Sequence, residues 1–134
     1  ENAMAVARFL GEQQQSSSLL EDIQYPGLPG HPDHALASRQ LQGGFGAMVS
    51  FRLAGDATMA DRFLAAAPGL AFCPSLGEAS TTLSHPASTS HRRLAENEAA
   101  ERGITAGTIR LSVGIESIEF ITQALELGLA GAAR

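Results

Sequence analysis

The chain has 134 residues, a formal net charge of −5, 44% hydrophobic residues and 17% charged residues. These values predict one folded domain with a buried core and exclude a disordered chain. The acidic balance argues against nucleic acid as a partner, and no apolar run approaches the roughly 20 residues of a membrane-spanning helix. Cys73 is the only cysteine, which excludes an internal disulfide and leads us to expect a reducing, cytoplasmic location.

The basic residues are all of one kind. Lysine and arginine together number nine, and all nine are arginines, so the chain contains no lysine. A reaction that needs a lysine amine therefore cannot draw it from this chain.

The first third of the chain predicts a helix, a strand and a second helix. Residues 2–13 carry apolar side chains at helical spacing, with Asn2 as the expected N-cap. Residues 19–25 are expected to form a strand that enters a turn rich in proline and glycine. We expect the second helix over residues 32–42, because Pro32 suits a first helical turn and two glycines follow.

The middle third predicts short strands around a helix and a long loop. Residues 47–53 alternate between apolar and polar side chains, which is typical of a half-buried strand. Asp56 is the expected cap of the next helix, and the apolar run 70–73 is expected to form a strand. Residues 74–90, rich in serine and threonine, predict a long loop with a short strand near 81–84, and such loops often carry function.

The last third predicts a short helix over residues 96–102, a strand over 108–113 and a helix over about 117–129. Helices and strands thus alternate along the chain with short connections. This order predicts a two-layer α/β sandwich, with helices packed on one face of a small sheet.

Arg110 is the first candidate for a functional side chain. Its neighbours Ile109 and Leu111 point to the opposite side of the predicted strand, so Arg110 faces away from the helix-covered core. A planar guanidinium matches a carboxylate in shape and charge, which makes a carboxylate anchor one interpretation. A surface arginine or a structural ion pair is the other.

Three other features resemble functional motifs, but their surroundings in the sequence argue against a functional role. Cys73 lies in an apolar run without an activating neighbour, so we interpret it as a small buried hydrophobic residue rather than a nucleophile. The glycines of residues 43–46 precede a strand, whereas a phosphate-binding loop would precede a helix. We expect no metal site, because no common zinc spacing is matched by the four histidines His31, His34, His85 and His91.

Several short motifs follow one another along nearly the whole chain. They are Tyr25-Pro26-Gly27-Leu28, His31-Pro32-x-His34, Gly44-Phe45-Gly46-Ala47, Ser75-Leu76-Gly77, His85-Pro86-Ala87 and Ile109-Arg110-Leu111-Ser112-Val113-Gly114-Ile115-Glu116. In this order the chain resembles the C-terminal domain of the pyridoxal-phosphate enzymes of sulfur amino-acid metabolism. That family includes cystathionine γ-synthase, cystathionine β- and γ-lyases, methionine γ-lyase and the homoserine-ester sulfhydrylases.

The resemblance implies a fold and a place in a longer enzyme. Residues 1–134 would form the substrate-closing C-terminal domain, an α+β sandwich whose small, mainly antiparallel sheet carries helices on one face. The cofactor would be pyridoxal phosphate, bonded to a lysine of a large N-terminal domain that is absent from this chain. The isolated chain is therefore expected to be inactive and to hold no catalytic residue.

The resemblance also implies the chemistry and the partners. The full-length enzyme would catalyse β- or γ-elimination or γ-replacement on methionine, cystathionine or a homoserine ester. Its expected partners are that amino acid, the missing domain and further copies of the enzyme, as in the family's tetramers, and not nucleic acid or membranes. A free-standing, non-catalytic module that self-associates remains the alternative.

The resemblance also implies roles for the residues of this chain that stand at the family's site positions. Arg110 would bind the α-carboxylate of the substrate, and Ser75 and Leu76 would lie beside it.

A specificity loop would comprise Pro74, Glu78 and Ser80. Several members of the family carry a glutamate where this chain has Pro74, and proline cannot bind a distal amino group. This difference favours methionine or a homoserine ester over cystathionine.

Overall fold

The computed structural model describes residues 1–134, apart from the side chain of Glu96. The elements follow in the order α1 (Asn2–Ser16), β1 (Leu20–Gln24), α2 (His34–Gln40), β2 (Met48–Leu53), α3 (Ala57–Ala66), β3 (Ala71–Phe72), β4 (Thr82–Ser84), α4 (Glu96–Glu101), β5 (Thr108–Ser112) and α5 (Ile118–Ala132). Every predicted element is present, although α1 and α5 each end three residues later than predicted.

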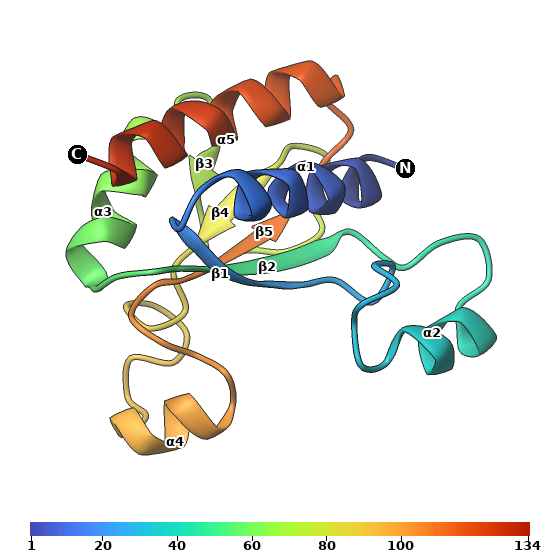
Figure 1. The fold of residues 1–134 in the computed structure, drawn as a ribbon, viewed down its shortest axis with the longest axis horizontal. Helices are drawn as coiled ribbons and strands as arrows, with labels where there is room; N and C mark the ends of the chain where they lie inside the picture. The colour runs from blue at the N-terminus through green and yellow to red at the C-terminus, as the bar shows by residue number, and fades with distance from the viewer.

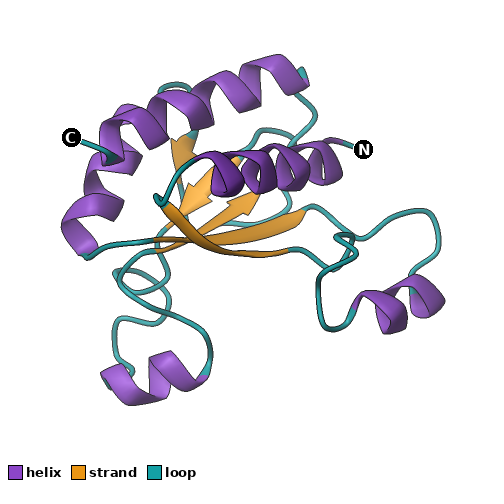
Figure 2. Ribbon diagram, in the orientation of Figure 1, coloured by secondary structure: helices purple, strands orange, loops and turns teal.

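The strands form one sheet in the order β1-β2-β5-β4-β3. All neighbouring pairs are antiparallel except β3 with β4, which is parallel. Helices α1 and α5 cover one face of this sheet, and α3 packs beside α5 (Figure 1). The short helices α2 and α4 lie outside that layer (Figure 2). The expected two-layer α+β sandwich with a mainly antiparallel sheet is therefore confirmed.

The core fills the space between the sheet and the helices. The predicted alternation of β2 is confirmed, since Val49, Phe51 and Leu53 are buried while the residues between them are partly exposed. The Phe51 ring meets Phe63 of α3 edge to face, with ring centroids 5.4 Å apart. Asp56 caps α3 as predicted, because its side chain accepts from the backbone N–H groups of residues 58 and 59.

Two expectations about helix starts are wrong. Asn2 is the first residue of α1 rather than its N-cap, and its side-chain amide donates to the carbonyls of Gly114 at 3.0 Å and Glu116 at 2.8 Å. A partner over 100 residues away thus outcompetes the local capping role. Helix α2 begins at His34 rather than at Pro32, because turns that hydrogen-bond over three residues continue as far as His34.

The expected burial of Cys73 is also wrong. The residue is partly exposed, because it follows β3 at the edge of the sheet. Phe72 in that edge strand is 52% exposed. An apolar run in the sequence therefore lies here on the surface of the chain.

A polar cluster holds the turn that follows β5. The Glu116 carboxylate accepts from the Thr81 backbone N–H at 2.6 Å and from the Thr81 hydroxyl at 2.8 Å. The Thr81 oxygen in turn accepts from the Gly114 N–H at 2.9 Å. Only glycine fits at position 114, because an added Cβ would collide with the Ala79 carbonyl oxygen. The start of β4 and the end of β5 are thereby joined.

The same cluster makes the fold sensitive to acid. Burial acts to raise the pKa of Glu116, but the hydrogen bonds from Thr81 outweigh it and leave the pKa below its ordinary value. A carboxyl whose pKa is lower in the folded state stabilises the fold above its unfolded pKa of about 4.3, and this contribution is lost as the pH falls through the folded pKa.

We predict that Glu116→Gln lowers the urea midpoint of unfolding at pH 7. It should also flatten the decline of that midpoint below about pH 4.3, where the carboxyl of the unfolded wild-type chain takes up its proton before that of the folded chain. Urea titrations of the chain from pH 7 to pH 3 measure this. Glu126→Gln, on an exposed position of α5, is the matched control and should follow the wild type. A Glu116→Gln profile parallel to the wild type would contradict the role of this carboxylate.

Candidate functional site

A polar row crosses the face of the sheet opposite to the covering helices. Ile109 and Leu111 are fully buried on the helix side, so Arg110 between them lies on the other side, as predicted. The register of the strands sets four side chains side by side across this outer face: Gln24, Ser50, Arg110 and Ser84.

The guanidinium of Arg110 is held by neutral groups. Its Nε donates to the Ser84 hydroxyl at 3.1 Å, and its Nη2 donates to the Pro74 carbonyl at 3.4 Å. A guanidinium has five N–H donors, so three are left without a partner among the residues that the structure describes. No described carboxylate pairs with Arg110. Its positive charge is therefore fixed in place and not neutralised.

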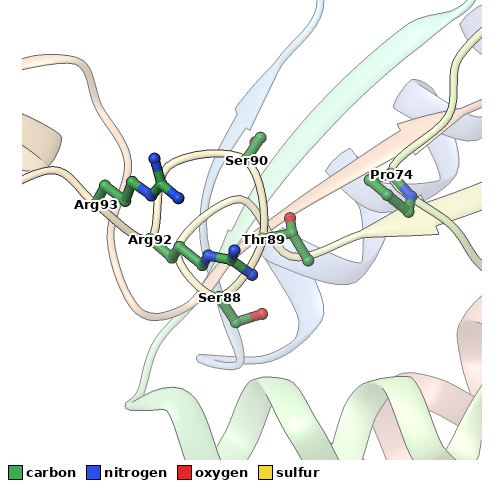
Figure 3. A pocket seen from close by; sticks show the side chains of 6 residues that line it. All are labelled: Pro74, Ser88, Thr89, Ser90, Arg92 and Arg93. Carbon is green, nitrogen blue, oxygen red and sulfur yellow. The ribbon is translucent and has the colours of Figure 1, made fainter.

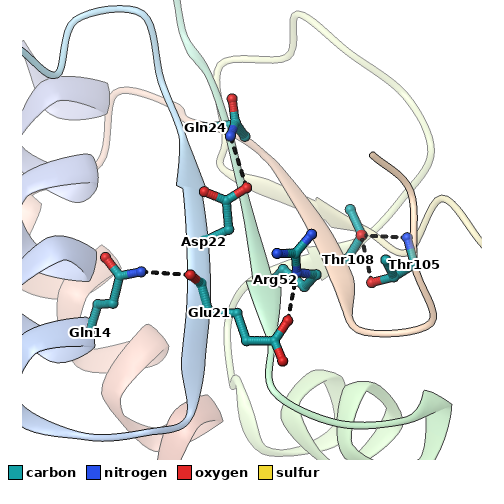
Figure 4. A network of polar contacts seen from close by, with 7 residues as sticks. All are labelled: Gln14, Glu21, Asp22, Gln24, Arg52, Thr105 and Thr108. Carbon is teal, nitrogen blue, oxygen red and sulfur yellow. Dashed lines mark hydrogen bonds and ion pairs between the residues drawn. The ribbon is translucent and has the colours of Figure 1, made fainter. Parts of the chain in front are cut away.

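A second arginine of the same sheet shows the contrast. Arg52 Nε donates to the Glu21 carboxylate at 2.7 Å, and Glu21 also accepts from Gln14 through its backbone carbonyl at 2.8 Å (Figure 4). Glu21 is exposed and Arg52 is partly exposed, so this ion pair contributes little to stability. The charge of Arg52 is thus paired with a carboxylate, whereas no described carboxylate pairs with Arg110.

A hollow of about 470 Å³ opens beside Arg110. Gln24 and Ser50 belong to its wall on the sheet side, and Pro86 and His91 belong to it on the loop side. The hollow admits a small molecule to the outer face of the sheet.

The loop that follows β3 runs along the end of β5. The Ser75 carbonyl accepts from the Thr82 hydroxyl at 3.5 Å, and the Gly77 N–H donates to the Ser112 hydroxyl at 3.5 Å. The Ala79 carbonyl accepts from the Ile115 N–H at 2.9 Å. These main-chain contacts hold the loop while its side chains stay exposed, Leu76 to 54%.

The predicted site residues are brought together only in part. Pro74 contacts Arg110 through its carbonyl oxygen, and Ser75 and Leu76 follow it directly in the chain. Glu78 and Ser80 are exposed farther along the loop, and neither side chain forms a hydrogen bond with another described residue.

The sequence reasoning did not assign a role to two neighbouring residues, Ser84 and His85. Ser84 binds Arg110, yet it was visible only as the end of a predicted strand whose pairing partner was unknown. His85 is 2% exposed, and its Nε2 lies 2.7 Å from the Ala106 carbonyl oxygen. Because a carbonyl can only accept, Nε2 carries the proton of a neutral His85. This hydrogen bond ties the loop after β4 to the turn before β5.

Two kinds of feature are not found in the part of the chain that the structure describes. No group of three His, Cys, Asp or Glu side chains lies close enough to hold a metal ion. No described helix combines the length and the apolar character needed to cross a bilayer.

Comparison with known proteins identifies the family. Residues 1–130 match the model of the family described as Cys/Met metabolism PLP-dependent enzyme. The chain is 41% identical over 129 residues to O-succinylhomoserine sulfhydrylase of Pseudomonas aeruginosa, which covers 96% of the chain and 31% of the relative. It is 39% identical to L-methionine gamma-lyase of Fusobacterium nucleatum subsp. polymorphum, covering 96% of the chain and 31% of that protein. The chain belongs to this family.

A solved structure of the family shares the fold. Cystathionine gamma synthase from Xanthomonas oryzae pv. oryzae, in complex with aminoacrylate and cysteine, superposes with a TM-score of 0.83 at 38% identity. The match covers 95% of this chain and 33% of that structure. The chain thus spans about a third of the length of its relatives.

The cofactor of the family is pyridoxal phosphate. Without a lysine, no residue of this chain can form a covalent bond to that cofactor. Arg110 is a cation that is held in place without an acidic partner among the described residues.

If Arg110 binds a substrate carboxylate, Ser84→Ala in a full-length protein that contains this chain is expected to raise the KM for that substrate about fivefold, with a smaller change in kcat. The lost hydrogen bond to Arg110 is worth about 1 kcal/mol and orients the guanidinium. Steady-state kinetics measure this. Ser18→Ala is the matched control, because Ser18 is exposed in the turn between α1 and β1, far in the chain from the residues around Arg110. Equal effects of the two substitutions would contradict a specific role for Ser84.

Proposed function

We propose that residues 1–134 are the substrate-closing C-terminal domain of a pyridoxal phosphate-dependent C–S lyase or transferase, and that Arg110 binds the α-carboxylate of its amino-acid substrate. The observation that carries this proposal is the state of Arg110, which is held by Ser84 and Pro74 and has no acidic partner among the described residues. Its three remaining N–H donors match the two oxygens of a carboxylate.

The part played by this chain is to position the substrate. When bound, pyridoxal phosphate serves as the electron sink for chemistry at the substrate's α-carbon. A carboxylate held by two parallel hydrogen bonds at Arg110 cannot rotate freely, so the bonds of the α-carbon keep one orientation. Orientation of this kind can contribute several kcal/mol to lowering the barrier. Ser75 and Leu76, beside Pro74, line the same side of the substrate, and Leu76 excludes water from it.

The substrate is proposed to be a homoserine ester or methionine. Pro74 offers no charge to a distal ammonium group, whereas Glu78 and Ser80, farther along the loop, supply polar side chains at the entrance. Relatives that use such substrates by name include the O-succinylhomoserine sulfhydrylase and the L-methionine gamma-lyase. The full-length enzyme is proposed to be a cytoplasmic homo-oligomer in which the large domain covers the outer face of the sheet.

We predict that Arg110→Ala in the full-length enzyme lowers kcat/KM by two or more orders of magnitude, chiefly through KM. Leaving a substrate carboxylate without its charged partner costs about 3 to 5 kcal/mol. Arg110→Lys should recover part of this loss, because lysine keeps the charge but not the planar fork. Arg52→Ala removes an arginine from the same sheet and serves as the control. Near-normal kinetics of Arg110→Ala would contradict the proposal.

The alternative, a free-standing module, is addressed by the exposed apolar side chains. Ile115 is 84% exposed, Leu76 54% and Phe72 52%. A domain that normally packs against a large neighbour should expose such a surface and self-associate in isolation. We predict that the isolated chain sediments as oligomers or binds a hydrophobic dye. A clean monomer in sedimentation velocity that binds no dye would contradict the view that this surface normally packs against a large neighbouring domain.

A further inference from the structure

A second hollow, of about 510 Å³, borders Pro74 and takes no part in the proposal above. Six residues line it, and they are Pro74, Ser88, Thr89, Ser90, Arg92 and Arg93 (Figure 3). Pro74 connects it to the α-carboxylate site, because the carbonyl of this proline accepts from the Arg110 guanidinium. Pro74 therefore borders the second hollow and also contacts the guanidinium of Arg110.

The charged side chains that line this second hollow are both positive. Figure 3 shows the guanidinium of Arg92 directed between Ser88 and Thr89, and that of Arg93 directed toward Ser90. Its described lining contains two cations, three hydroxyl groups and no carboxylate. An ammonium group would be repelled here, whereas an anion would be attracted by two adjacent guanidinium groups.

The loop that carries these groups is ordered by its own hydrogen bonds. The hydroxyls of Ser88 and Thr89 donate to the carbonyl of the buried His85, at 3.2 Å and 2.8 Å. The His91 N–H donates to the Pro86 carbonyl at 2.9 Å. With the protons of Ser88 and Thr89 used within the loop, the two guanidinium groups are the main donors left for an anion. A held loop loses little entropy when it binds a ligand.

We propose that Arg92, assisted by Arg93, binds the distal carboxylate of a dicarboxylic homoserine ester, O-succinyl-L-homoserine, while Arg110 binds its α-carboxylate. This inference rests on the proposed function and names its substrate class. A succinyl ester carries a carboxylate at each end, so one molecule satisfies both cationic positions. An acetyl ester ends in a methyl group and leaves Arg92 without a ligand.

The test uses the full-length enzyme with its cofactor and compares two substrates, O-succinyl-L-homoserine and O-acetyl-L-homoserine. Arg92→Gln combined with Arg93→Gln is expected to lower kcat/KM for the succinyl ester about tenfold to a hundredfold, the range for a lost charge-assisted hydrogen bond. The same double variant should leave kcat/KM for the acetyl ester within about threefold of the wild type, because no contact to that ester is lost.

Two further readouts accompany the kinetics. Free succinate should inhibit the wild type competitively and should inhibit the double variant at least about tenfold more weakly, for the same loss of a charged contact. Arg62→Gln, at an exposed position of α3, is the control and should change neither the ester preference nor the inhibition.

The outcomes separate this inference from the proposed function. Equal losses on both esters, or none on either, overturn the Arg92 assignment while a strong effect of Arg110→Ala keeps the proposed function. Loss of the visible absorbance of bound cofactor in the double variant assigns the arginines to the cofactor's phosphate and also overturns it. If the enzyme does not turn over the succinyl ester, the inference is overturned. If it turns over neither ester and Arg110→Ala leaves its kinetics unchanged, the inference and the proposed function are both overturned.

Discussion

The pairing of β5 with β2 and β4 is the constraint on which the site depends. It buries Ile109 and Leu111 under the helices and thereby forces Arg110 onto the outer face of the sheet. It also sets Ser84 beside Arg110, so that a neutral hydroxyl and the Pro74 carbonyl hold the guanidinium. An arginine held by neutral groups keeps its charge for a ligand, whereas Arg52, paired with Glu21 on the same sheet, does not.

The end of β5 is secured by contacts from distant parts of the chain. Asn2 binds the carbonyls of the following turn, and Thr81 binds its Glu116 carboxylate and its Gly114 amide. The motif of residues 109–116, which is one of those that carry the family resemblance, thus has a physical explanation. Gly114 is needed for close approach of the loop, Glu116 for the hydrogen bonds to Thr81, and Arg110 faces the hollow.

The proposed roles of the two cationic positions match their places in the fold. Arg110 lies on the central strand β5, and under the proposed function it would bind the α-carboxylate that every amino-acid substrate shares. Arg92 and Arg93 lie on the loop after β4, where sequence changes cost the fold little, and such positions suit the recognition of whatever varies between substrates. Pro74 connects the two positions through its carbonyl and its side chain.

The amino-acid pattern alone determined the elements, the alternation that turns Arg110 outward and the Asp56 cap, because each depends on neighbours in the chain. The absence of a lysine follows directly from the composition. The pattern also supplied the motifs that indicate the family. Tertiary structure decided which residues contact one another. Asn2 donates to a turn more than 100 residues away instead of capping its helix, Cys73 follows an edge strand and is partly exposed, and Ser84 accepts from Arg110. Strand order and long-range hydrogen bonds follow from packing of the whole chain, and local periodicity carries no information about them.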